Sequence, residues 1–262
     1  QVHCQGVRMR TAFRSATPDI DMTKRLQRRM LITFVYLIAL VFLARPGLAA
    51  TPMEEAYAAS QRGDFQTAVS IWRTLAQTSD AMAQYNLGRA YSNGEGVPQD
   101  YNEAIRWYTL AAETGNVMAQ SNLGVLYKNG TGVPQDYREA LKWFRLAALW
   151  GNPDAQFQVA QMHWLGQGTP KNYVEARKWF LLSAKQSDAQ AQNNLGVIYR
   201  DGYGVKSNLA RAYMWFSLSA DKDSNAAKNY PALKQRLSPS QLAEANIMLL
   251  KCRHPDYQDC GE

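Results

Sequence analysis

The feature that most constrains this chain is a segment of 36 residues that occurs four times in succession without a gap. The aligned copies begin at Ala83, Ala119, Ala155 and Ala191. A unit of this length cannot bury its apolar face by itself, whereas stacked copies bury a continuous core. The repeat therefore predicts a row of similar units, each packed on its neighbours.

Each copy contains two helical patterns on either side of a turn. In the first copy, Ala83 and Leu87 lie one helical turn apart, and residues 104–112 form a second, broader apolar face. Asp100 and Glu103 stand three residues apart before that face, as in a capping box. The pattern predicts one antiparallel helix pair per copy and an all-α fold.

The turn between the two patterns contains Gly-x-Gly, as in GEGVPQDY at 94–101 and GTGVPQDY at 130–137. A dinucleotide-binding loop would need a preceding strand and a third glycine, and a phosphate-binding P-loop would need Gly-Lys-Ser/Thr. The chain has neither at this place. We interpret the glycines as turn residues, the first ending a helix and the second letting the chain reverse.

The sequence contains none of the common catalytic signatures, such as Gly-x-Ser-x-Gly or His-Glu-x-x-His. His163 stands where the other copies have Tyr91, Tyr127 and Tyr199, which favours a packing role over that of a general base. We therefore predict that the protein is not an enzyme and holds no cofactor and no metal.

Three motifs within each copy resemble the Sel1-like repeat, a relative of the tetratricopeptide repeat: A-x-x-N-L-G-x-x-Y, N-G-x-G-V-P-Q-D-Y and E-A-x-x-W-Y/F-x-x-A-A. The resemblance covers residues 81–224 and implies a right-handed α-solenoid of antiparallel helix pairs, with a concave and a convex surface. Residues 50–80 are predicted to form an N-terminal capping hairpin. Residues 225–262 are predicted to form C-terminal capping helices and a tail.

Relatives with this architecture bind partners in the concave groove that the first helix of each repeat lines. Aromatic and cationic residues, which dominate binding hot spots, occur at positions of this helix where the copies differ. The predicted groove residues are Tyr85, Arg89, Lys128, Phe157, Gln161, Trp164, Asn193 and Arg200. The alternative is that some of them pack against neighbouring repeats. Trp150, which has no counterpart in other copies, is a second candidate contact.

These features together predict a monomeric scaffold that binds another protein or a peptide. Its cations would help to select an acidic segment, and the resemblance implies roles such as envelope signalling or regulation.

The net charge of +7 is concentrated near the N-terminus. Residues 1–49 hold eight of the 29 Lys and Arg residues and two of the 22 Asp and Glu residues, so the rest of the chain carries +1. A nearly neutral body gives no electrostatic support for nucleic-acid binding, which we do not predict.

Residues 1–49 are interpreted as an upstream segment followed by a signal peptide. Basic residues precede the apolar run 31–44, and small residues follow it. We expect cleavage between Ala49 and Ala50, a periplasmic or secreted protein, and no stable membrane insertion afterwards. The alternative is that the segment stays uncleaved as an anchor.

Cys252 and Cys260 are the cysteines downstream of this segment. In an oxidising compartment an even pair favours a disulfide, while a metal site with His254 and Asp256 is the weaker alternative. Their spacing resembles the cysteine pairs of the Helicobacter cysteine-rich proteins, a branch linked to penicillin binding and β-lactamase activity. The alternative function is therefore a binder of cell-wall-related small molecules, or a β-lactamase-like enzyme.

Overall fold

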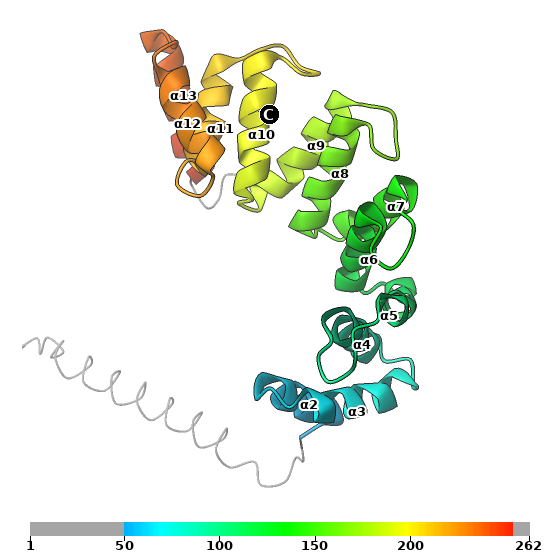
Figure 1. Ribbon diagram of the computed structural model, residues 1–262. Coiled ribbons are helices and arrows are strands. Elements are labelled where there is room, and N and C mark those ends of the chain that lie inside the picture. The colour runs from blue at the N-terminus through cyan, green and yellow to red at the C-terminus, as the bar shows by residue number, and fades with distance from the viewer. Residues whose placement is uncertain (1–49, 254–262) are drawn as a thin grey trace, which may run out of the picture. The chain divides into compact units, whose positions relative to one another are not determined.

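The computed structural model describes residues 50–253, and this part of the chain is all-helical. Of its twelve helices, the first ten form five antiparallel pairs, each packed on the next, and the last two both pack on the second helix of the fifth pair (Figure 1). The predicted all-α solenoid is confirmed. The predicted signal segment and Cys260 lie outside the described residues, so cleavage and the Cys252–Cys260 pairing stay predictions.

The helices have nearly uniform lengths. The five pairs are α2 (Pro52–Gln61) with α3 (Phe65–Ala76), α4 (Ala81–Asn93) with α5 (Tyr101–Glu113), α6 (Val117–Asn129) with α7 (Tyr137–Leu149), α8 (Pro153–Leu165) with α9 (Tyr173–Lys185), and α10 (Ala189–Asp201) with α11 (Leu209–Ser219). The last two helices, α12 (Ser224–Lys234) and α13 (Pro239–Arg253), both pack on α11.

The first helix of each repeat begins at an Asp or Asn and ends at a glycine. In α4 the side chain of Asp80 accepts a hydrogen bond from the Ala83 N–H at 2.8 Å, which satisfies one of the unpaired amides at the helix start. Gly94 ends the helix in the left-handed conformation with φ of 73°. The interpretation of this glycine as a helix terminator is therefore confirmed.

The capping box predicted for α5 is only half present. Asp100 accepts hydrogen bonds from the N–H groups of Asn102 and Glu103, but Glu103 pairs with Arg106 at 3.3 Å instead of returning to Asp100. The reason is that the Asp100 N–H already donates to the Tyr91 carbonyl at 2.9 Å. The loop closes on the end of α4, so the reciprocal bond has no free donor.

The second glycine of the loop has a role that the turn interpretation missed. A Cβ added to Gly96 would lie 2.5 Å from the carbonyl oxygen of Phe65, at the start of α3. A Cβ added to Gly168 would likewise lie too close to the carbonyl oxygen of Tyr137, at the start of α7. Each loop therefore packs directly against the second helix of the preceding pair, and a side chain there would separate the two pairs.

A buried glutamine joins each repeat to the one before it. The Gln120 side-chain amide in α6 donates to the Ala112 carbonyl near the end of α5 at 3.1 Å, and Gln156 and Gln192 make the same bond in the next two repeats. Carbonyls at a helix end have no partner within the helix. In these repeats the carbonyl accepts one hydrogen bond from the backbone of the following turn, and the glutamine donates a second one from the next repeat.

Inside each repeat, a helical glycine brings the two helices together. The Cα of Gly124 in α6 faces the ring of Phe144 in α7, and a Cβ there would lie 2.6 Å from that ring. Phe144 is fully buried. The third copy differs, because Ala160 takes the glycine position and its aromatic partner Phe180 packs at a tilt against Phe157, with ring centroids 5.6 Å apart.

We expect Gly124→Ala to lower the free energy of unfolding by about 1–3 kcal/mol, because the added methyl group overpacks against the Phe144 ring. In a Phe144→Leu background the same change should instead stabilise by up to about 1 kcal/mol, since alanine favours the helix. Urea denaturation of the four proteins measures both effects. A stabilising Gly124→Ala in the wild-type background would contradict the packing argument.

Candidate functional site

A cavity of about 240 Å³ lies between α8 and α10, with α9 beneath it. Its lining residues are Gln161, Trp164, Leu165, Phe180 and Asn194. Gln161, Trp164 and Leu165 follow the helical spacing i, i+3 and i+4, so they share one face of α8. The cavity thus includes two of the predicted groove residues, Gln161 and Trp164.

Trp164 forms an aromatic wall whose orientation is fixed by two tyrosines. Its ring meets Tyr173 and Tyr203 edge-on, with centroid distances of 4.8 and 4.9 Å, and the tyrosine rings lie 5.1 Å apart. Edge-to-face aromatic pairs are favourable beyond their burial of apolar area. The indole is therefore held in place before any ligand arrives.

The floor of the cavity is apolar and its sides carry two amides. Phe180 is 1% exposed and belongs to the core. The side-chain amides of Gln161 and Asn194 are half-buried, and neither is hydrogen-bonded to another residue of the described chain. An amide offers both a donor and an acceptor, which suits the N–H and C=O of a peptide backbone.

The predicted cations of the groove are already engaged. Arg89 lies 3.8 Å from Glu95, and Arg200 pairs with Asp201 at 2.7 Å. The hydrogen bond from Arg200 lowers the pKa of Asp201 and raises the pKa of Arg200. Lys128 differs, because its Nζ donates at 2.8 Å to the neutral amide of Gln158 and its charge is not cancelled.

The other predicted groove residues pack within the stack. Tyr85 lies against Tyr108 with ring centroids 5.9 Å apart. Phe157 and Asn193 are buried, each 7% exposed. They offer little surface to a partner and instead support neighbouring helices, which was the alternative considered for such positions.

Sequence reasoning missed Phe180, Leu165, Asn194 and Tyr203 as neighbours of Trp164. A signal existed for Tyr203, because the middle position of Gly-x-Gly is Glu95 in the first copy and aromatic only here. The other three occupy ordinary repeat positions, so only the packing of α8, α9 and α10 brings them together.

His163 is half-buried in α8, as expected of a packing residue, and its Nδ1 is buried with no hydrogen-bond partner. Burial lowers the pKa of His163, and the nearby charge of Arg145 from α7 lowers it further, while Glu175 from α9 acts in the opposite direction. The lowered pKa means that the folded protein disfavours the charged imidazolium.

The described residues contain no group of three or more His, Cys, Asp or Glu side chains able to hold a metal ion. Among the same residues, no helix combines the length and apolar character needed to cross a membrane.

A family model described as Sel1 repeat matches four consecutive segments, residues 81–116, 117–152, 153–188 and 189–224. The chain belongs to the Sel1 repeat family. Sel1 repeats form a fold generally used for protein–protein interaction, and these scaffolds are typically non-catalytic. No curated protein matches the chain.

Two solved bacterial Sel1 structures are similar to this chain. A Sel1 repeat protein from Oxalobacter formigenes is 32% identical, with 68% of this chain and 74% of that chain covered and a TM-score of 0.65. The protein c5321, a protective antigen present in uropathogenic Escherichia coli strains, is 33% identical with a TM-score of 0.69. That match covers 75% of this chain and 45% of the antigen.

We expect His163→Tyr to remove part of the acid sensitivity of the fold. Because the pKa of His163 is lowered in the folded state, protonation of the imidazole favours unfolding. The stability that the neutral imidazole contributes is therefore present above about pH 6.5 and is lost as the pH falls below that value. Tyrosine is the residue of the other copies at this position. Melting temperatures at pH 7.5 and 5.5 measure the effect. An equal fall in melting temperature between pH 7.5 and 5.5 in the wild type and in His163→Tyr would contradict this prediction.

Proposed function

We propose that this Sel1 repeat protein is an exported, non-enzymatic scaffold that binds an extended segment of another protein in the cavity between α8 and α10. The observation that carries the proposal is the combination of a fixed Trp164 wall with two unpaired amides, Gln161 and Asn194, around one apolar hollow. Rigid aromatic walls are common at the energetic centres of interfaces.

The dimensions of the cavity favour a side chain of a polypeptide as its occupant. Its volume of about 240 Å³ is below the roughly 300–1,000 Å³ of pockets that enclose drug-sized ligands. One apolar side chain would contact Trp164 and Phe180. The amides of Gln161 and Asn194 would then bond the adjoining backbone.

Electrostatic selection has a smaller role in this proposal than the sequence suggested. Arg89 and Arg200 each face a carboxylate of this chain. A surface cation that is already paired contributes little binding free energy toward a second carboxylate. Lys128 keeps its charge, so it is the groove cation that would contact an acidic residue of the partner.

Trp164→Ala should reduce partner capture at least tenfold, about the effect of losing a hot-spot tryptophan. Ser92→Ala is the matched control, because Ser92 occupies the same repeat position in α4. The immobilised full chain is incubated with an envelope extract, and bound proteins are quantified by mass spectrometry. Circular dichroism verifies that both variants are folded. The same proteins retained by wild type and Trp164→Ala would refute the cavity as the binding site.

The export part of the proposal rests on the apolar run 31–44, with basic residues before it and small residues after it. In a bacterial host the expressed chain should appear outside the cytoplasm with Ala50 as its first residue. Cell fractionation followed by intact-mass measurement tests this. An uncleaved, membrane-associated chain would support the anchor alternative, and a cytoplasmic chain would rule out export.

A further inference from the structure

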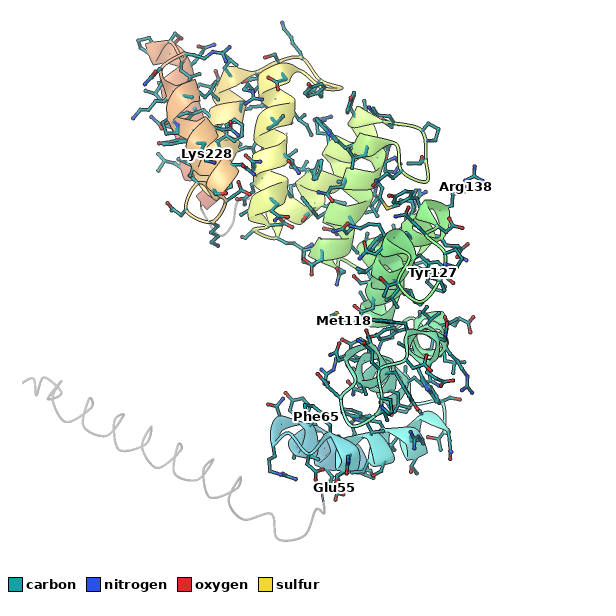
Figure 2. The ribbon with its side chains drawn as sticks, in the orientation of Figure 1. Glu55, Phe65, Met118, Tyr127, Arg138 and Lys228 are labelled. Carbon is teal, nitrogen blue, oxygen red and sulfur yellow. The ribbon has the colours of Figure 1, made fainter. Side chains whose placement is uncertain are left out.

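The exposed face of α7 carries cations in its first turns and apolar residues in its last. We call this set the α7 face: Arg138, Lys142, Arg145, Leu146, Leu149 and Trp150. Figure 2 shows Arg138 extending away from the ribbon. Leu146, Leu149 and Trp150 are 38, 68 and 75% exposed. Three large apolar side chains in water at positions i, i+3 and i+4 form one contiguous stripe on a helix.

The other repeats show that the fold does not require these residues. At the positions of Leu149 and Trp150, α5 and its cap have Glu113 and Thr114, and the α9 repeat has a lysine and a glutamine. The backbone is nearly the same, since φ is −87° at Trp150 and −85° at Thr114. The scaffold is therefore built equally well with polar residues. The apolar side chains at 149 and 150 need another explanation than packing.

The surroundings of Trp150 extend the apolar surface. The side chain of Asn152 contacts the Met118 sulfur at 3.9 Å, and Met118, at the start of α6, is half exposed. On the α9 side, Gln186 donates to the Gly151 carbonyl at 2.9 Å. Met118 and Gln186 thus contact the two residues that follow Trp150 in the chain.

The charge of the α7 face defines what would bind there. Within α7 three cations oppose the single carboxylate of Glu139, which pairs with Lys142 at 3.0 Å, so the helix carries a net charge of +2. A complementary partner has acidic residues beside apolar ones. We infer that the α7 face binds an amphipathic, acidic segment of a partner protein, independently of the cavity between α8 and α10.

Other occupants fit this surface less well. An antiparallel second copy would place the cationic half of each α7 face on the apolar half of its partner, and a parallel copy would oppose like charges. An anionic lipid surface would have to approach Glu113 and Asp154, which are exposed on the neighbouring helices α5 and α8.

The test compares the wild-type full chain with the double variant Leu149→Glu and Trp150→Thr, which restores the residues of the first repeat. The probe is a fluorescent synthetic helix of glutamate and leucine, and its anisotropy reports binding. We expect the double variant to bind at least about tenfold more weakly. Trp164→Ala should bind the probe like wild type, which separates this surface from the proposed cavity. A lysine–leucine helix, the charge-reversed control, should bind weakly to all of them.

A second variant tests the charges and introduces no acidic residue. Arg138→Asn with Arg145→Thr also restores first-repeat residues. Its binding should be weaker at low salt and should change less than that of wild type when ionic strength rises from about 0.05 to about 0.5 M. Circular dichroism verifies that each variant is folded.

Three results would overturn the inference. The first is equal affinity of wild type and both variants for the acidic helix, or no binding by any of them. The second is binding to phosphatidylglycerol vesicles, but not to the acidic helix, that falls in the Leu149/Trp150 double variant. The third is a wild-type dimer in sedimentation analysis that this variant abolishes, which would assign the surface to a second copy.

Discussion

The bond between a buried glutamine and the end of the preceding helix is the contact on which the stack depends. Helix ends expose carbonyls that need partners, and in a solenoid many of these ends lie between repeats, away from water. Gln120, Gln156 and Gln192 each donate a second hydrogen bond, at 3.1 Å, to a carbonyl that already accepts one from the backbone of the turn after the helix. Because the amide reaches one particular carbonyl, it also fixes how far one repeat is displaced along its neighbour. The close approach of each loop glycine to the preceding helix pair depends on that register.

Once the register is fixed by a few recurring residues, the remaining positions are available for binding. Gly124 and Phe144 serve the scaffold, and equivalents occur in other copies. Trp164 and Trp150 occur once each and lie in different settings. Trp164 is held by tyrosines beside a hollow, whereas Trp150 is exposed at the C-terminal end of α7. A repeat protein can thus present two chemically distinct surfaces on neighbouring helix pairs without changing its core.

The helix pairs and their ends could be predicted from sequence because they depend on neighbours a few residues apart, as Gly94 illustrates. The contacts between repeats could not be predicted from the sequence. The approach of Gly96 to Phe65 and the bond of Asp100 to Tyr91 require the folded loop. For the site, variation between copies identified Gln161 and Trp164, but it gave no measure of burial. Phe157 varies as much as they do and is interior.

The contacts made by the loop glycines and by the junction glutamines run in one direction along the chain. Each loop glycine rests on the helix pair made before it, and each junction glutamine bonds a carbonyl that precedes it in sequence. When a helix pair is synthesised or emerges from a translocation channel, the surface on which it packs is therefore already complete. Its packing on that surface needs no residue that comes later in the chain. The stack can assemble from its N-terminal end, with a finished template at every stage.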